Sequence, residues 1–473
     1  KNLMYKVGKA QGEENKERGI NTFLSPSVNI LRTPQAGRVW EGFGEDPYLA
    51  GVAAEQIVRG IQENGVIATI KHFVGNDQET YRQASSSNIG MQALMDIYVE
   101  PFYRSIKYAK CGSVMGAYNA YNNTYCCENK FLLTDVLRGI LGFKGFVMSD
   151  WWAIVSDGPE SLNAGCDMNM PGGAGKGIDY MGRDKSFWSK LDKYVEEGKV
   201  SVDRITEAAT RIIATMYQMN QMDDFPKVDL FTETKTKERI AIQRQAATES
   251  QILLTNDGIL PLRNTEDLNI TKIAIIGNDA FPRDCINGDK DMECKNKTNL
   301  VVNGHIPLGY GSGTTKFDYL ITPLEGITKL AKSKDIKVVS SGKLIYEKEN
   351  GVTVKASEDI ETAEKIAADA DVAIVFVKAN SGEEYITVEN TIGDRLDLDL
   401  WHNADKLVES VVAVNPNTIV VINAPSVVNM PWMDKVRAIV FSGFPGAESG
   451  NAIADVLFGV VNPSGHLPYV WGK

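Results

Sequence analysis

Polar side chains that could do acid, base or sugar-binding chemistry recur at the ends of short β-type runs in the first half of the chain. Arg38 follows the first run, Lys71 and His72 lie near the end of the second, Tyr118 ends the third and Asp150 ends the fourth. In βα barrels the catalytic groups come from the carboxyl ends of successive strands, because those ends converge on one face. We therefore expect these side chains to share a site, although each alone would read as an ordinary solvated loop residue.

Asp150 ends a buried-strand pattern and is followed directly by Trp151 and a second tryptophan. An N-cap of a helix is the plain alternative. A carboxylate beside indoles also suits a sugar, because pyranose rings stack their apolar C–H faces on aromatic rings while acids contact their hydroxyls. Positive charge from Lys71, His72 and Arg38 would keep Asp150 ionised, as a nucleophile requires.

Glycoside hydrolysis needs a second carboxylic acid, roughly 5 to 5.5 Å from the nucleophile in a retaining enzyme. Spacing alone does not choose one of the 61 acidic residues. The stretch 381–389 is acidic and follows a buried β-type run, so it is a candidate, with a solvated acidic loop as its alternative.

The elements that would position these groups form two α/β sets. In residues 1–216, β-type runs alternate with helical patterns, which predicts βα units of a barrel-like domain. One helix should begin after Asp46 as N-cap, with Pro47 in its first turn and Gly65 just beyond its end. Residues 217–246 are expected to be a linker, and 247–473 a layered α/β sandwich. The strand candidates are 22–30, 65–74, 112–118, 145–151 and 165–170 in the first set and 272–276, 336–339, 372–377, 418–422 and 437–441 in the second.

The composition of the chain restricts the classes of molecule that it is expected to bind. The chain has 473 residues, 43% apolar and 23% charged, as in a globular protein of two or three domains. Its charge of −11 would repel a nucleic-acid backbone or an anionic membrane, so a neutral small molecule fits better. No apolar run reaches membrane-spanning length. We also expect no metal and no cofactor, because the six cysteines and four histidines lack zinc-ligand spacing.

Two features bear on the compartment. Cys285 and Cys294 are spaced for a small-loop disulfide in an oxidising compartment, and a glycosylation sequon begins beside them at Asn296. Further sequons begin at Asn122 and Asn269. We therefore expect a secreted protein, whose export signal is absent from this sequence or already removed.

The chain resembles glycoside hydrolase family 3, and most closely its fungal-type β-glucosidases. The resemblance covers essentially the whole chain. The motifs that carry it, in order, are Gly37-Arg38-Val39-Trp40-Glu41-Gly42-Phe43, Lys71-His72-Phe73, Met115-Gly116-Ala117-Tyr118-Asn119, Val147-Met148-Ser149-Asp150-Trp151, 162–171, Asn256-Asp257-Gly258, Asn380-Ser381-Gly382-Glu383, Gly393-Asp394-Arg395, 443–450 and 461–468.

The resemblance implies a retaining, exo-acting β-glucosidase that releases terminal β-D-glucose by double displacement. It implies Asp150 as nucleophile and Glu383 as acid/base, although Glu384 stands where the relatives usually have Gly. The other site residues that it implies are Arg38, Lys71, His72, Met115 and Tyr118 around the terminal glucose, with Trp151 and Tyr385 on the leaving-group side.

The fold that the resemblance implies is a (β/α)8-type, TIM-like barrel followed by a six-stranded α/β/α sandwich, so that the two acids come from different domains. The family barrel begins with strands and a hydroxyl-binding Asp that would precede residue 1, and fungal-type members continue into a fibronectin-like domain. We expect those segments, and a second copy of the chain in a homodimer, as protein partners.

Three alternatives stay open. A β-xylosidase or a broad exo-β-glucanase would keep the fold and change the sugar. A non-catalytic sugar-binding relative would keep the fold without the chemistry. The presence of both acids argues against this alternative. A nucleotide-binding α/β protein is suggested by Gly309-Tyr310-Gly311-Ser312-Gly313, but this run lacks the spacing of a dinucleotide fingerprint.

Overall fold

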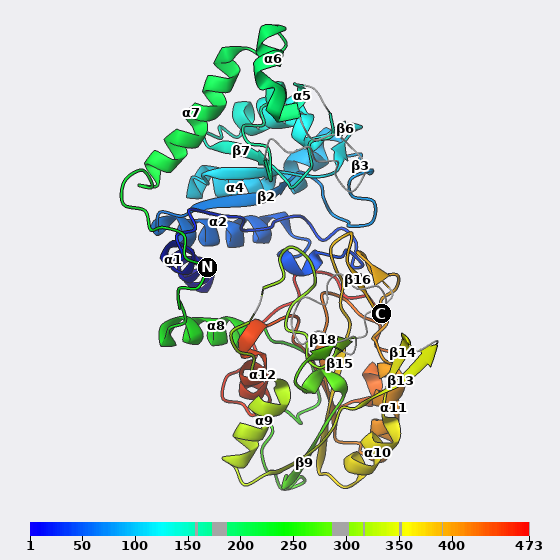
Figure 1. Cartoon of the computed structure of the whole chain (residues 1–473). Coiled ribbons are helices and arrows are strands. Elements are labelled where there is room, and N and C mark those ends of the chain that lie inside the picture. Colours follow the sequence, from blue (N-terminus) through cyan, green and yellow to red (C-terminus); the bar gives the residue numbers. More distant parts are fainter. Residues whose placement is uncertain are drawn as a thin grey trace. The chain divides into compact units, whose positions relative to one another are not determined.

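The chain divides into two compact units (Figure 1). The computed structural model describes residues 1–156, 159–172, 187–285, 302–315, 317–349, 352–389 and 391–472. The first unit comprises Lys1–Arg32 and Glu41–Thr236, and the second comprises Thr33–Trp40 and Lys237–Lys473. The division after Thr236 falls inside the stretch 217–246. The short segment Thr33–Trp40, from the first half of the sequence, packs as part of the second unit.

The first unit contains a parallel sheet in the order β1-β2-β4-β7, and helices connect its successive strands. Each strand pairs with the next one along this order, which is the arrangement of consecutive βα units in an arc of a barrel. The elements that build this arc are β1 (Thr22–Phe23), α2 (Pro47–Glu63), β2 (Ile67–Phe73), α4 (Glu100–Ala109), β4 (Ser113–Gly116), η4 (Phe131–Ile140) and β7 (Phe146–Ser149).

Shorter elements and peripheral helices complete the first unit. They are α1 (Asn2–Glu17), η1 (Val39–Glu41, partly in the second unit), β3 (Ser86–Ser87), α3 (Met91–Ala93), η2 (Leu94–Tyr98), β5 (Ala120–Tyr121), β6 (Thr124–Tyr125), η3 (Cys126–Glu128), α5 (Glu160–Ala164), η5 (Phe187–Lys190), α6 (Leu191–Glu196) and α7 (Val202–Gln218). The predicted helix after Asp46 is α2, because the Asp46 carboxylate accepts hydrogen bonds from the amides of Tyr48 and Leu49.

The two faces of this sheet carry different clusters. Ala68, Ile70, Val114 and Val147 point into the large core that the helices cover. The alternate positions Ile67, Met115, Phe146 and Met148 form a smaller cluster on the opposite face, with Trp151 and Met168 packed against it. Since successive side chains of a strand point to opposite faces, this second face is the one that a barrel turns inward.

Two strand predictions were only partly right. The run 22–30 forms a strand only at Thr22–Phe23, because Pro26 has no backbone N–H to donate; beyond it, Val28 donates to the Lys71 carbonyl in an isolated pairing. The run 165–170 forms no strand, yet Met168 N and Ser149 N donate to the carbonyls of Val147 and Met168 respectively. The chain at Met168 thus lies along β7 as a partial next strand.

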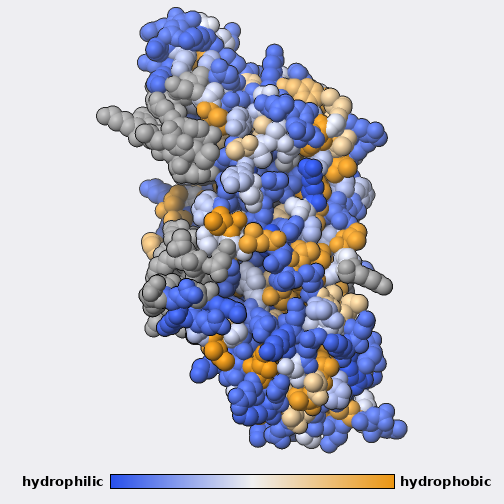
Figure 2. Space-filling model, turned by 90° about the vertical axis from the view of Figure 1, so that its right-hand side faces the viewer, coloured by the Kyte–Doolittle hydropathy of each residue, from blue (hydrophilic) through white to orange (hydrophobic). Residues whose placement is uncertain are grey.

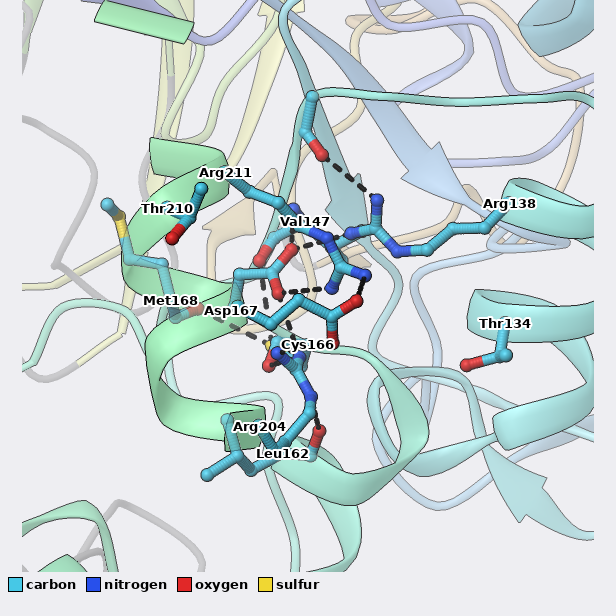
Figure 3. A network of polar contacts seen from close by, with 12 residues as sticks. Thr134, Arg138, Val147, Leu162, Cys166, Asp167, Met168, Arg204, Thr210 and Arg211 are labelled. Atoms are coloured by element: carbon cyan, nitrogen blue, oxygen red, sulfur yellow. Dashed lines mark hydrogen bonds and ion pairs between the residues drawn. The ribbon is translucent and has the colours of Figure 1, made fainter. Parts of the chain in front are cut away.

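One buried carboxylate ties β7 to this neighbouring segment and to two helices (Figure 3). The Asp167 side chain is 0% exposed and accepts from Arg138 at 2.6 Å, Arg204 at 2.8 Å and Arg211 at 2.9 Å. It also accepts from the Val147 amide of β7 at 2.9 Å. Arg138 comes from η4, whereas Arg204 and Arg211 come from α7. Asp167 therefore supplies the buried negative charge at which three guanidinium groups converge, while the more exposed Glu207 pairs with two of them, Arg204 and Arg211.

The second unit is built on a six-stranded sheet in the order β12-β9-β15-β18-β19-β8, as the resemblance predicted. The first five strands are parallel, and β8 joins the edge antiparallel to β19. The sequence analysis did not identify β8. The strands are β8 (Ile252–Asn256), β9 (Lys272–Ile276), β12 (Lys337–Ser341), β15 (Val372–Lys378), β18 (Thr418–Asn423) and β19 (Ala438–Phe441), and the five parallel ones lie where strands were predicted.

Both faces of this sheet are covered by helices. Ala373, Val375 and Val377 of β15 pack in a core with α10 (Ile360–Ala368) and α11 (Ala404–Val414). The alternate residues Val372, Ile374 and Phe376 pack in a core with α9 (Pro323–Lys332) and α12 (Ser449–Leu457). A strand buried on both faces reads as a continuous apolar run, which explains why 372–377 was recognisable.

The remaining elements of the second unit are α8 (Lys237–Glu249), η6 (Asn278–Ala280), β10 (Asp284–Cys285), β11 (Val302–Asn303), β13 (Leu344–Glu349), β14 (Val352–Glu358), β16 (Thr387–Val388), β17 (Thr391–Ile392), η8 (Met433–Lys435) and η9 (Gly446–Glu448). On the face seen in Figure 2, hydrophilic residues predominate, with apolar side chains in small groups among them. In the part of the chain that the structure describes, no helix combines the length and the apolar character that a membrane crossing requires.

Asp167→Asn should lower the free energy of unfolding of the first unit by about 3 to 5 kcal/mol, because it removes the buried counter-charge of three arginines and leaves only Arg204 and Arg211 with a partner, the more exposed Glu207. Unfolding in urea, followed by tryptophan fluorescence, measures this change. The matched control is Glu197→Gln, since Glu197 pairs with Lys193 and Lys199 at the surface of the same unit and should leave the midpoint nearly unchanged. Equal stability of the two variants would contradict the anchoring role of Asp167.

Candidate active site

Asp150 lies one residue beyond the carboxyl end of β7, where the strand delivers it as the sequence predicted. The residue is buried, and its backbone N–H donates to the Gly116 carbonyl at the end of β4. The Trp151 amide donates to Asp150 Oδ1 at 2.7 Å. The hydrogen bond to Oδ1 favours the ionised form of the carboxyl and fixes its orientation.

His72 faces the other oxygen of the same carboxylate. Its Nε2 lies 3.5 Å from Asp150 Oδ2, and the two side chains are 4% and 10% exposed. His72 belongs to β2, and β4 lies between β2 and β7 in the sheet. The structure thus brings together His72 and Asp150, as predicted, from two strands that are not direct neighbours.

The other predicted residues of the first unit have distinct places. Met115 is fully buried in the inner cluster, against which Trp151 packs. Tyr118 is buried under the guanidinium of Arg82, which lies 4.0 Å from the centre of its ring. Lys71 contributes its backbone to the pairing with the 26–28 segment. Sequence reasoning missed Arg82, although a cation over an aromatic face orients that ring.

Arg82 is held by a carboxylate on its own loop. It is almost fully buried and pairs with Glu79 at 2.7 Å. Nearby, burial raises the pKa of the Asp77 carboxyl to about 7, while the charge of Arg32 and a hydrogen bond from the Ile30 amide oppose that rise. The loop after β2 therefore carries two buried carboxyl groups, of which Glu79 is ion-paired with Arg82 and Asp77 is under the electrostatic influence of Arg32.

In the second unit, Glu383 lies on the loop that follows β15, where the acidic stretch predicted a site. Its side chain is 3% exposed. The Ser312 amide donates to Oε2 at 2.6 Å, Arg38 NH1 lies 3.3 Å from Oε1, and the Tyr385 hydroxyl lies 3.5 Å from Oε2. Burial disfavours the charged form of a carboxyl group, whereas a neighbouring guanidinium and an amide donor favour it.

Arg38 reaches Glu383 because the segment 33–40 is part of the second unit, which sequence reasoning missed. Asp394 and Arg395 hold this segment: Gly37 N donates to Asp394 Oδ1 at 2.7 Å, and Arg395 donates to the carbonyl of Pro34 at 2.7 Å. Ser381 Oγ donates to the Gly37 carbonyl at 2.8 Å. The Gly-Asp-Arg motif noted in the sequence therefore holds the segment 33–40, which contains Arg38, against the loop that contains Glu383.

The glycine run 309–313 serves the same loop. A side chain at Gly311 would lie 2.9 Å from Glu383 Cβ, and one at Gly309 would lie 2.1 Å from the Trp40 indole nitrogen. Tyr310 N donates to the Ser381 carbonyl, and Glu383 N donates back to the Tyr310 carbonyl. Because these glycines lack side chains, the segment 309–313 can pack closely against the acidic loop. This packing explains the glycine run without a nucleotide-binding role.

Behind the Glu383 loop, a buried polar network joins the ends of β9, β15 and β18. The Lys378 ammonium donates to Asn278 Oδ1 and to the carbonyls of Val302 and Gly304 at 2.7 to 2.9 Å. Asn423 donates to both oxygens of Asp279. Burial lowers the pKa of Lys378, in spite of the negative charges of Asp279, Glu389 and Glu358. These hydrogen bonds fix the carboxyl end of β15, from which the Glu383 loop continues.

The cysteines have two outcomes. The predicted pair Cys285 and Cys294 has its side chains outside the described residues. The thiols of Cys111, Cys126, Cys127 and Cys166 are free and buried. Burial raises the pKa of Cys111 to about 11 and those of Cys126 and Cys166 to about 12, so these thiols stay protonated. Within the described ranges no cluster of His, Cys, Asp and Glu has the make-up of a metal site.

Comparison with known proteins identifies relatives over both units. Residues 1–215 match the profile described as Glycosyl hydrolase family 3 N terminal domain, and 251–473 match Glycosyl hydrolase family 3 C-terminal domain. The curated relatives include a probable beta-glucosidase L of Aspergillus fumigatus, 40% identical over 485 residues, which cover 100% of this chain and 61% of the relative.

Solved structures give the same result. A beta-glucosidase from Chaetomella raphigera has a TM-score of 0.88 and 39% identity, covering 100% of this chain and 63% of its own. Beta-glucosidase 3B from Thermotoga neapolitana, solved in complex with glucose, has a TM-score of 0.79 and 32% identity, covering 99% of this chain and 63% of its own. The chain thus spans a little over three fifths of the length of these proteins.

Gly37→Ala should destabilise the second unit by roughly 1 to 3 kcal/mol, because the added methyl group would lie 2.1 Å from the Gly382 carbonyl oxygen and the backbone must move. Thermal unfolding of the variant measures the loss. Gly90→Ala is the control, since its backbone φ is −69° and nothing lies within 4 Å of the new methyl group. If Gly37→Ala were as stable as the control, the close packing of 33–40 on the Glu383 loop would be wrong.

Proposed function

Because the chain belongs to glycosyl hydrolase family 3, we propose that the full-length protein is a retaining, exo-acting β-glucosidase. It would release glucose from the non-reducing end of cello-oligosaccharides and other β-glucosides. The observation that carries the proposal is the buried Asp150 carboxylate at a strand end, with His72 at 3.5 Å and an indole beside it. The printed names of the relatives, which are β-glucosidases, support the choice of sugar.

In the first half of the proposed reaction, Asp150 attacks the anomeric carbon and forms a glycosyl ester. Glu383 donates its proton to the departing glycosidic oxygen. His72 opposite Oδ2 and the Trp151 amide on Oδ1 suit Asp150 to this role, because both keep the buried carboxyl ionised before attack.

In the second half, Glu383 takes a proton from water, which attacks the anomeric carbon and releases Asp150. The contacts of Glu383 with Arg38 and Ser312 favour the carboxylate form that this step needs. The protonated form needed first requires the Arg38 contact to weaken, and a glucose that engages Arg38 would do this. We propose that the pKa of Glu383 is raised, as its role as general acid requires.

We propose that Arg38, Lys71, His72, Met115 and Tyr118 bind the terminal glucose. Trp151 and Tyr385 would contact the leaving group, and the 54% exposure of Tyr385 suits a position at the entrance.

Secretion is proposed as well. The sequon residue Asn269 is exposed, whereas the side-chain amide of Asn122 is engaged by the backbone of Ile89. The mass of the secreted protein before and after deglycosylation would test secretion with a glycan at Asn269.

Asp150→Asn should reduce kcat on an aryl β-glucoside by about a thousandfold or more, because an amide cannot form the glycosyl ester. Wild-type protein should hydrolyse that substrate faster than the aryl β-xyloside. Asp135→Asn, an exposed residue of the same unit, is the control and should keep full activity. Substantial turnover by folded Asp150→Asn would rule out the assigned nucleophile, and a preference for the xyloside would favour a β-xylosidase.

Glu383→Ala should lose about a hundredfold or more in rate on cellobiose and much less on an aryl glucoside whose leaving group needs no proton. Azide should restore part of the rate, because it attacks the glycosyl ester without a general base. Glu384→Ala is the neighbouring control and should behave as wild type. The reverse result, with azide rescue in Glu384→Ala alone, would exchange the roles of these two acids.

A further inference from the structure

Asn29 makes two hydrogen bonds with the backbone of His72. The Asn29 Nδ2 group donates to the His72 carbonyl at 3.0 Å, and the His72 N–H donates to Asn29 Oδ1 at 3.0 Å. A carbonyl can only accept and an N–H can only donate. The pair therefore fixes which end of the Asn29 amide is oxygen and which is nitrogen.

This fixed orientation determines where the imidazole of His72 carries a proton. Asn29 Oδ1 also lies 2.9 Å from His72 Nδ1. Because Oδ1 is an acceptor, Nδ1 must carry a hydrogen. The neutral ring has only one N–H, so a neutral His72 would turn the lone pair of Nε2 toward Asp150 Oδ2, 3.5 Å away. The neutral form thus meets the carboxylate with repulsion, and the doubly protonated form meets it with an N–H.

We propose that Asn29 is a positioning residue that keeps His72 doubly protonated, and so cationic, beside Asp150 at pH values where an ordinary histidine is neutral. The inference rests on the proposed role of Asp150 as nucleophile. Asn29 acts only through His72. A cation in this place holds the carboxylate ionised before attack and stabilises it again in the second half of the reaction, when water attacks the anomeric carbon and the bonding electron pair returns to the Asp150 oxygen.

The charged groups around His72 are largely compensated by partners of their own. Asp150, beyond β7, is the anion at 3.5 Å. On the loop after β2, Glu79 pairs with Arg82, and Asp77 lies under the influence of Arg32. Lys71 adjoins His72 in β2, and its charge, like the burial of the ring, opposes protonation. The contact with Asp150 and the acceptor at Nδ1 both favour the cation.

The test is a direct measurement of the ring nitrogens of His72 by 15N NMR of the full-length protein, with His72→Gln to assign the signals. The wild-type ring should carry protons on both nitrogens at pH 7, and its pKa should fall by about one unit or more in Asn29→Ala and also in Asp150→Asn. The basic limb of the pH profile of kcat/KM should move to lower pH in Asn29→Ala by the same amount, measured on an aryl β-glucoside whose leaving group needs no proton from Glu383.

Asn122→Ala is the matched control. Asn122 makes the same double contact with the backbone of Ile89, at 3.0 and 3.2 Å, where no imidazole is present. Its loss should cost stability without moving the pKa of His72 or the basic limb. A single ring proton on wild-type His72 at pH 7, or an unchanged pKa in Asn29→Ala, would overturn the proposal, as would a basic limb that stays in place while the pKa moves.

The wild-type spectrum decides the protonation state even if Asn29→Ala does not fold. It also requires no turnover, so a full-length protein without β-glucosidase activity would refute the proposed function and leave the protonation of His72 to be judged separately.

Discussion

A carboxylate that is buried and must stay ionised needs positive charge or hydrogen-bond donors facing it, and the first unit is arranged to meet this requirement at Asp150. In the proposed mechanism a cationic His72 supplies the charge from β2, two strand positions away in the sheet. Neighbouring strands lie about 4.8 Å apart, so side chains from β2 and β7 meet only where both point to the same, inward-curving face. The contact between His72 and Asp150 therefore depends on the barrel-like curvature of the sheet.

The position of β7 also depends on the ion pairs of Asp167, at the opposite end of the strand from Asp150. Asp167 and its three arginines join β7 to η4 and α7 near the start of the strand, while Asp150 lies beyond its other end. In barrels of this type, residues at the amino-terminal end of the strands contribute stability and those at the carboxyl end contribute chemistry. In the second unit, Gly37, Gly309 and Gly311 instead permit close contacts with the Gly382 carbonyl, the Trp40 indole and the Glu383 side chain respectively.

Several parts of this arrangement could be predicted from the sequence. Strands buried on both faces, such as β15, appear as unbroken apolar runs, and the Asp46 cap and Pro47 mark the start of α2. The residue types at strand ends indicated Asp150 and His72. The choice of Glu383 came only from the family resemblance, because an acidic loop by itself looks like a solvated one.

Other parts could not be predicted because they depend on contacts between residues far apart in the sequence. Nothing local marks 33–40 as belonging with residues 381–395, and the contact of Arg38 with Glu383 follows from that packing. No local pattern in the sequence indicates the pairing of Asn29 with His72 either, because the two residues lie 43 positions apart. The antiparallel edge strand β8 was missed because its short run directly follows a helix.

The central claim is that the carboxylate of Asp150 forms the covalent bond to the sugar. A 2-deoxy-2-fluoroglucoside with a good leaving group slows release of the glycosyl ester, so that mass spectrometry of the digested full-length protein can locate the trapped sugar. We predict one fluoroglucosyl group on Asp150 and none in Asp150→Asn. A label on any other carboxylate, or steady turnover of the inactivator with no label at all, would contradict the account.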